Sequence, residues 1–468
     1  MTEQPELSEA LRRFKELYGD GEARVLRAPA RINIIGEHVD YVPGDSMASL
    51  CFASREHAMY MLFRASNEGV VRGASTLEKF PPFSFAIHEE IGEEIGEEIG
   101  EEEIGNETTW ESTVFNRPAP SPHWSNYVKG AVSFASWKYG VGVKRGFDFL
   151  IDSSIPPNSG ASSSSALVTL AGAAIREVNR LEFKLKELAL DSSQAEWFIG
   201  TRGGAMDHLA ICLATPGNAI YISHSNQHTE TIPMPDHRYR WITFFSHEAD
   251  KGRELMLEYN ERVAVSRIMI PALLRDARDL PETMTLEEFE RRSPQAFREC
   301  EREFPNLVRD RRSRPLKLFD RSKHHTEESV RVKSMAGLFF ANHLKDEERM
   351  RKIGDTLNQS HASLRDYYDV STPEVESLVE IITADPLVYG ARLMGGGFGG
   401  NVLALTTAEN TQALTRHAQN EFYSPRGRDG LGEGSVMVST PGNGLEISTA
   451  SDSARVISQN DARYRSRY

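Results

Sequence analysis

The chain has 468 residues, of which 39% are hydrophobic and 26% charged, which predicts two or three domains with a sizeable core. The net charge of −14 argues against nucleic acid or an anionic membrane as the main partner. No apolar run could span a bilayer, and the acidic N-terminus does not resemble a signal peptide. The cysteines Cys51, Cys212 and Cys300 have no metal-ligand or redox spacing, so we expect a reduced cytoplasmic protein without disulfides.

Helices and strands are mixed along the first half of the chain. Apolar spacing predicts helices and strands in the order helix 7–18, strand 24–35, strands within 48–64, helix 124–139, strand 147–152, helices 166–179 and 185–198, and strand 217–223. An acidic insertion over about 88–106 repeats Glu-Glu-Ile-Gly, with nine glutamates between 89 and 105. We expect it to be a solvated insertion; an interaction module is the alternative.

A domain boundary is expected near residue 224. It gives an N-terminal domain (1–224), a C-terminal domain (225–445) and a polar tail (446–468). The second domain has predicted helices and strands in the order helix 254–270, helix 327–342, helix 347–363, strand 393–405 and helix 411–423. Because the two kinds of element do not alternate cleanly, the pattern predicts an α+β fold.

One basic, polar stretch in this domain is expected to be a surface loop, over 309–323. The adjoining His324 and His325 lack a third ligand at a spacing that suits a metal. We therefore expect the two histidines on the surface, at the start of a helix.

Three segments rich in small residues have the composition of a phosphate site: 29–41, 156–166 and 393–400. Glycine lets a backbone approach a phosphate, and a helix N-terminus offers free N–H groups and a positive dipole end. The serine-rich segment fits this plan because it stands between a predicted strand and an alanine-rich helix. No Gly-x-x-x-x-Gly-Lys-Ser/Thr pattern is present, which excludes a P-loop. Each segment taken alone would equally suit a linker or a tight turn.

Five segments together resemble the motifs of the GHMP small-molecule kinases, most closely the galactokinase family: 31–41, 124–130, 203–207, 358–374 and 392–400. The resemblance covers most of the chain. It implies an N-terminal domain like domain 2 of ribosomal protein S5, a ferredoxin-like C-terminal domain, and an active site in the cleft between them. It also implies an ATP-dependent sugar 1-kinase that uses Mg²⁺ and converts galactose to galactose 1-phosphate.

Phosphoryl transfer to an alcohol needs a group that takes the hydroxyl proton and a cation that offsets the developing charge. Asp207 and Arg31 are the candidates, although local sequence alone would also suit a helix N-terminal acid and a surface ion-pair partner. By resemblance, Asp207 is the catalytic base and Arg31 is its partner.

A dense polar patch after an apolar strand, Glu37, His38 and Asp40, would by itself suit a solvated turn. The resemblance implies that Glu37 and His38 bind the far hydroxyl end of the sugar, and that Asp40 binds ring hydroxyls. It further implies that Tyr259 contacts the sugar and that the backbone of Gly204 faces it. A half-buried helix tyrosine is the alternative for Tyr259.

The expected ATP-binding residues are Trp124, Ser159, Gly160, Ala161, Ser162, Ser163, Ser164, Ser165, Gly396 and Gly397. The resemblance implies Mg²⁺ ligation by a serine hydroxyl, that of Ser163 or Ser164, and by Glu196. The spacing from Glu196 to Asp207 is one residue shorter than in the family, so an exposed helix glutamate is the alternative. Trp124 would equally suit the core.

The chain departs from the galactokinase pattern at three places. Ala30 stands where glycine is usual, 44–53 lacks the usual Gly-x-Val-Leu-Pro-x-Ala, and His208 follows the expected base where glutamine is common. N-acetylgalactosamine or arabinose therefore stay alternative substrates, and a non-catalytic galactokinase-like regulator is a further alternative. The expected catalytic residues are all present, which favours the enzyme. The expected partners are a sugar and ATP, with no nucleic acid or membrane, in a monomer or weak homo-oligomer.

Overall fold

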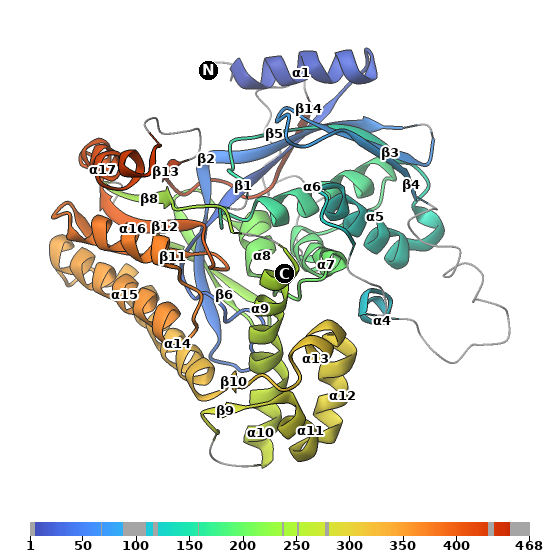
Figure 1. The fold of residues 1–468 in the computed structure, drawn as a ribbon. Coiled ribbons are helices and arrows are strands. Elements are labelled where there is room, and N and C mark those ends of the chain that lie inside the picture. Colours follow the sequence, from blue (N-terminus) through green and yellow to red (C-terminus); the bar gives the residue numbers. More distant parts are fainter. Residues whose placement is uncertain are drawn as a thin grey trace.

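The computed structural model describes residues 5–449 except 67, 88–108, 116–119, 158, 236–237, 250–251, 277–279 and 429–434. The acidic insertion expected over about 88–106 lies outside the described residues, and so does the chain from residue 450 onward. Two sheets organise the described part, each covered by helices (Figure 1).

The first sheet is built on a long strand, β2 (Ala48–Ala65), which pairs antiparallel with three others. Its members are β14 (Glu446–Thr449), β1 (Arg24–Ile35), β2, β5 (Phe147–Ser153), β3 (Val70–Ser75) and β4 (Phe83–Ala86), in that spatial order, with β6 (Asn218–Ser223) beside β2 and β7 (His228–Pro233) beside β6. β1 is buried along most of its length, so it carries polar residues at its end into the interior of the molecule.

Helices cover both faces of the first sheet (Figure 1). Helix α1 (Pro5–Tyr18) lies on the outer face, where Ala10 and Phe14 join a small apolar cluster with residues of the sheet. The opposite face is covered by the helices α5 (Ser125–Tyr139), α6 (Ser163–Val178), α7 (Leu185–Glu196) and α8 (Met206–Leu213), while α4 (Trp110–Phe115) packs nearby. α6 is apolar and buried along most of its length, as the alanine-rich pattern predicted.

The second sheet is antiparallel, in the order β11 (Val388–Met394), β12 (Asn401–Thr407), β8 (Tyr239–Phe245) and β13 (Val436–Ser439). The helices of this half are α14 (Phe319–Phe339), α15 (Asp346–Asp366), α16 (Pro373–Ala384) and α17 (Thr411–Ala418). α15 and α16 both pack against β11, and the last five residues of this strand are buried. The loop from β11 to β12 therefore begins at a strand that is held firmly in place.

Between β8 and α14 the chain forms a helical lobe (Figure 1), whose apolar core also includes Val39, Tyr41, Val42 and Met47 from the segment between β1 and β2. Its elements are α9 (Arg253–Ala264), a π-helical turn (Val265–Met269), α10 (Ile270–Asp276), β9 (Thr283–Met284), α11 (Leu286–Arg292), α12 (Pro294–Glu303), α13 (Pro305–Arg311) and β10 (Leu316–Lys317). Among the residues that the structure describes, no helix is both long enough and apolar enough to cross a membrane.

The domain limits expected from the sequence need two corrections. β7 pairs with β6 in the first sheet, so the change of sheet comes after residue 233 and not near 224. Residues 446–449 were expected to begin a polar tail, but they pair with β1 as β14. The chain thus returns to the first sheet after completing the second.

Two expectations for the helical lobe and α14 are wrong. The stretch 309–323 is not a loop, because α13, β10 and the start of α14 occupy most of it. Its charges misled the prediction: Arg311 is buried and forms ion pairs with glutamates of α9. His324 and His325 are 0% and 3% exposed, inside α14 and not on the surface.

Candidate active site

A cavity of about 1070 Å³ lies where the end of β1, α6, α8, α9 and the β11–β12 loop meet. The residues predicted for the site that line it are Arg31, Glu37, His38, Asp40, Trp124, Gly160, Ser162, Ser163, Ser164, Ser165, Glu196, Gly204, Asp207, Tyr259, Gly396 and Gly397. Ser159 and Ala161 were also predicted, for ATP, but do not line the cavity. They are 1% and 0% exposed, so their side chains pack inward.

Arg31 of β1 and Asp207 of α8 form an ion pair in the cavity wall. Nε and Nη2 of Arg31 lie 2.7 Å and 2.6 Å from Oδ1 of Asp207. Burial acts to lower the pKa of Arg31, but the carboxylates of Asp207 and Glu37 outweigh it and raise the pKa above its ordinary value. The Asp207 side chain keeps 24% of its surface exposed, against 3% for Arg31. A carboxylate held this way can take a proton from a bound hydroxyl.

Ser162, the residue before α6, leaves the start of that helix open. A serine here usually accepts a hydrogen bond from a first-turn N–H, but Ser162 makes no such bond. Its backbone is left-handed, with φ 62°, and its hydroxyl donates to Oδ2 of Asp207 instead. The first-turn N–H groups, which belong to Ser163, Ser164 and Ser165, therefore have no side-chain cap and can hold an anion.

The glycine-rich loop between β11 and β12 packs directly on this serine-rich turn. A Cβ on Gly160 would stand 2.6 Å from the carbonyl oxygen of Met394, and one on Gly395 would stand 2.7 Å from Cα of Gly160. Both glycines also have left-handed backbones, with φ 81° and 95°. Only glycine permits this approach. Two segments far apart in the sequence thus form one wall of backbone.

Glu37 fixes the glycine-rich loop in place. Its Oε1 accepts hydrogen bonds from the N–H of Gly395 at 2.6 Å and from Nη2 of Arg392 at 3.2 Å. Arg392 is fully buried and also donates to the carbonyl oxygens of Asn33 and Ile34 in β1. Glu37 lines the cavity and also joins the segment after β1 to the glycine-rich loop after β11. The sequence did not indicate this second, positioning role.

Asp40 and Gly204 are in close contact, as expected if both face one ligand. A Cβ on Gly204 would stand 2.5 Å from the carbonyl oxygen of Asp40 and 2.5 Å from its Oδ2. Burial, together with the nearby Asp207 carboxylate, raises the pKa of Asp40 to about 7. Asp40 therefore changes charge near neutral pH.

His38 and Tyr259 complete a polar wall of uncharged rings, with their centroids 6.0 Å apart. Burial lowers the pKa of His38 well below its ordinary value, so the imidazole is neutral. Burial and then Asp40 raise the pKa of Tyr259 well above its ordinary value, so its hydroxyl keeps its proton. Neutral donors and acceptors of this kind suit an uncharged polyol better than an anion.

Glu196, at the end of α7, faces the start of α6. Its Oε2 accepts a hydrogen bond from Ser165 Oγ at 2.9 Å and lies 3.1 Å from Nε2 of His208. Burial acts to raise the pKa of Glu196, but its contacts with His208 and Ser165 outweigh burial and lower it. The described residues include no cluster of three acidic, histidine or cysteine side chains that could hold a metal ion alone. One carboxylate beside serine hydroxyls fits Mg²⁺, which usually completes its shell with substrate phosphates and water.

Three family profiles match segments that build this cavity. "GHMP kinases N terminal domain" matches 126–215, and "GHMP kinases C terminal" matches 340–424. "Galactokinase galactose-binding signature" matches 12–51, which includes Arg31 and the polar patch after β1. The chain belongs to the GHMP kinases.

Relatives of this GHMP kinase extend along almost the whole chain. It is 28% identical to the galactokinase of Chloroflexus aurantiacus over 464 residues, covering 96% of this chain and 99% of the relative. It is 29% identical to the galactokinase of Lactococcus lactis subsp. cremoris, covering 89% and 91%.

Solved structures have the same fold. The structure of Lactococcus lactis galactokinase complexed with galactose matches with a TM-score of 0.69 at 26% identity, covering 94% of this chain and 99% of that one. The mevalonate kinase of Methanococcus jannaschii matches with a TM-score of 0.53 at 14% identity, covering 90% and 98%. At that identity the second match shows only a shared fold.

The cavity of this GHMP kinase also has wall residues that were not predicted. Tyr41 ends the polar patch after β1, whereas Arg253 and Arg309 come from α9 and α13. The two arginines carried no sequence signal, because single charges in a helix usually only face solvent. Trp124 lies at the wall with its Nε1 donating to the carbonyl oxygen of Pro81 at 2.8 Å.

Proposed function

We propose that this GHMP kinase is a galactokinase, which transfers the γ-phosphate of ATP to the anomeric hydroxyl of galactose and releases ADP and galactose 1-phosphate. The observation that carries the proposal is the position of the Arg31–Asp207 pair. It stands between a wall of neutral hydrogen-bonding groups, which suits a sugar, and the open start of α6, which suits a polyphosphate. The galactose-binding signature over 12–51 supports the choice of sugar.

In the proposed reaction Asp207 accepts the proton of the anomeric hydroxyl. The oxygen of that hydroxyl attacks the γ-phosphorus, and the bond from phosphorus to the bridging oxygen of ADP breaks. Arg31 holds the Asp207 carboxylate in place, since two of its nitrogens lie within 2.7 Å of one carboxylate oxygen. The pair is in place before the reaction, so it needs little reorganisation when charge develops, which favours the transition state.

The sugar contacts are assigned to His38, Asp40, Tyr259 and the backbone of Gly204, with Glu37 holding the loop behind them. The nucleotide contacts are assigned to the first turn of α6 and to Gly396 and Gly397, with Trp124 beside the adenine. Glu196 and the hydroxyl of Ser163 or Ser164 would hold Mg²⁺, which offsets negative charge on the phosphates when bound. The three thiols are buried and unpaired, which supports a reducing cytoplasmic setting, and we expect a monomer or weak homo-oligomer.

A kinase for a related sugar is the second candidate. His208, which departs from the galactokinase pattern, lines the cavity and is buried against Glu196. Histidine in place of the usual glutamine changes the cavity wall next to Asp207, and this change can alter which sugar the cavity accepts.

A coupled ADP-release assay against a panel of free sugars tests the proposal. With Mg-ATP present, we expect kcat/KM to be highest for galactose among galactose, N-acetylgalactosamine, glucose, arabinose and mannose. A higher kcat/KM for another sugar would move the substrate and keep the mechanism. Binding of sugar without turnover of any would favour a regulator. Removing Mg²⁺ with a chelator should abolish turnover and leave sugar binding intact.

A further inference from the structure

His38 has one buried ring nitrogen without a hydrogen bond of good geometry among the described residues. It lines the cavity, is 4% exposed and has a left-handed backbone with φ 58°. Its Nδ1 is hydrogen-bonded to the hydroxyl of Tyr41 at 2.8 Å. Its Nε2 is buried and has no hydrogen-bond partner of good geometry among the described residues. A buried polar atom without a partner costs free energy unless a ligand satisfies it.

The Tyr41 hydroxyl is itself held by a second layer of buried side chains. It lies 2.9 Å from the hydroxyl of Tyr368, which lies 3.1 Å from Ser266 Oγ and 3.3 Å from Nε2 of His325. Ser266 stands in the π-helical turn that follows α9, and such turns often occur beside functional sites. Tyr368 also packs against the His38 ring, with their centroids 4.7 Å apart. A continuous chain of contacts therefore runs from His38 to α14.

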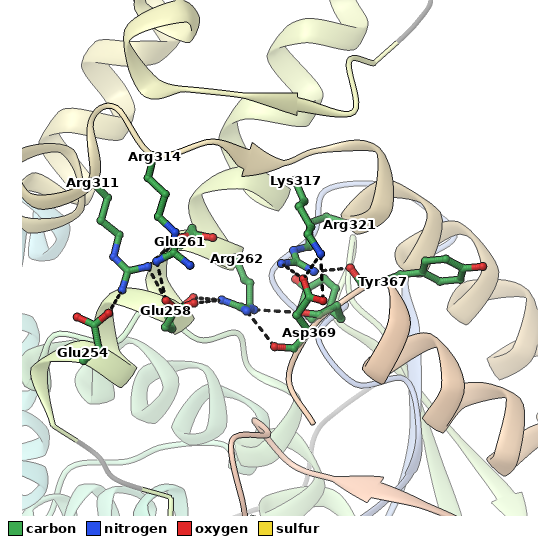
Figure 2. A network of polar contacts seen from close by, with 11 residues as sticks. Glu254, Glu258, Glu261, Arg262, Arg311, Arg314, Lys317, Arg321, Tyr367 and Asp369 are labelled. Carbon is green, nitrogen blue, oxygen red and sulfur yellow. Dashed lines mark hydrogen bonds and ion pairs between the residues drawn. The ribbon is translucent and has the colours of Figure 1, made fainter. Parts of the chain in front are cut away.

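The backbone of residues 367–369 is fixed by Arg262 of α9 and Arg321 of α14, which Figure 2 shows. Arg262 of α9 donates from Nε to the carbonyl oxygen of Tyr368 at 3.1 Å and from Nη2 to that of Asp369 at 3.0 Å. Arg321 of α14 bonds the Asp369 carboxylate at 2.9 Å and also the carbonyl oxygen of Tyr367. Tyr368 is fully buried, so its hydroxyl has little freedom to move.

The direction of these hydrogen bonds decides what His38 offers to a ligand. In a neutral imidazole one nitrogen donates and the other accepts. If Tyr41 donates to Tyr368, it accepts from Nδ1 of His38, and Nε2 is left as an acceptor. If Tyr41 donates to Nδ1, Nε2 carries the proton and is a donor. The hydrogen bond between Tyr41 and Tyr368 therefore influences both the tautomer of His38 and the orientation of its ring.

We propose that Tyr368 is a positioning residue for the sugar: through Tyr41 it sets the orientation and the tautomer of His38. The inference rests on the proposed function only in taking the ligand of His38 to be the sugar. Tyr368 lies behind Tyr41 and is not among the cavity-lining residues, so it acts only through other side chains.

The test is Tyr368→Phe, which removes one hydroxyl and keeps the ring. We expect the KM for the sugar to rise about 5- to 10-fold, the equivalent of one hydrogen bond, with the KM for ATP unchanged. Tyr367→Phe is the matched control, because the Tyr367 hydroxyl bonds Lys323 at 2.7 Å. In Figure 2 the Tyr367 ring points away from Arg262, Arg321 and Asp369. It should leave both KM values unchanged.

A double-mutant cycle shows whether Tyr368 acts through His38. Tyr368→Phe should change sugar affinity, measured by calorimetry without ATP, much less in a His38→Ala background than in the unmodified protein. An equal loss in both backgrounds, or a folded Tyr368→Phe variant with unchanged sugar KM, would overturn the proposal. The sugar used is the one that the unmodified protein binds best. Failure to accept galactose would count against the proposed substrate alone.

Discussion

Gly204→Ala measures how tightly the sugar wall is built. An added Cβ would stand 2.5 Å from two oxygen atoms of Asp40, whereas ordinary contact begins at 3.4 Å. One of those atoms is a backbone carbonyl, so the segment must move by about 1 Å and cannot simply rotate a side chain away. The backbone of Gly204 is not in the left-handed region, so alanine adds no strain of its own there.

We expect this displacement to reduce kcat/KM for the sugar on the order of 10²-fold, the loss that follows from misplacing a positioning group by about 1 Å. Steady-state kinetics with varied sugar and saturating Mg-ATP measure it, and most of the loss should be in the sugar KM. Gly203→Ala is the matched control, because its Cβ would meet only the Tyr259 hydroxyl, at 3.3 Å. A few tenths of an ångström relieve that contact, so its effect should be far smaller.

Circular dichroism and thermal melting separate a local displacement from unfolding. A folded Gly204→Ala variant with the sugar kinetics of the unmodified protein would show that sugar binding does not need Asp40 in its present position. Equal losses in the Gly203 and Gly204 variants would show that the shorter Cβ contact at Gly204 is not the cause.

Three further predictions concern charged residues of the site. Asp207→Ala and Arg31→Ala should each lower kcat by on the order of 10²-fold or more with the fold retained, and near-normal rates in either would make the assigned mechanism wrong. Asp40→Ala should raise the sugar KM about 10-fold or more with the ATP KM unchanged; an unchanged sugar KM would refute the contact. The pKa of Asp40 is about 7 in the folded protein, raised by burial and then by Asp207. Since an unfolded aspartate loses its proton near pH 4, ionising Asp40 costs stability as the pH rises from about 4 to about 7. The Tm of Asp40→Asn minus the Tm of the unmodified protein should therefore increase as the pH rises from about 4 to about 7, and stay constant above pH 7. A Tm difference that does not change with pH would count against the raised pKa of Asp40.

Elements with strong local patterns could be predicted from the sequence. The strand predicted over 24–35 is β1, and the helix predicted over 124–139 is α5 with Trp124 before it. β8 was missed, although four of its seven residues, Trp241 to Phe244, are buried. A short apolar run has no alternation, so periodicity does not distinguish a buried strand from part of a helix.

Contacts between distant segments could not be predicted. Arg311 looked solvated in the sequence, yet it is buried because Glu258 and Glu261 of α9 face it. His324 looked like a surface residue, yet its Nε2 lies 3.2 Å from the carbonyl oxygen of Glu37. Local composition describes charge and polarity but not the partner that tertiary folding supplies. The residues of the cavity were predictable by resemblance, whereas the hydrogen bonds that hold them were not.

Transfer of phosphate to the anomeric oxygen is tested most directly by identifying the product by ³¹P NMR after incubation with Mg-ATP and galactose. We expect galactose 1-phosphate in equal amount with ADP, and we expect the Asp207→Ala variant to form it slower by on the order of 10²-fold or more. ADP without a sugar phosphate, or phosphate on another hydroxyl, would contradict transfer to the anomeric oxygen. The same product from Asp207→Ala at an undiminished rate would contradict the assigned base.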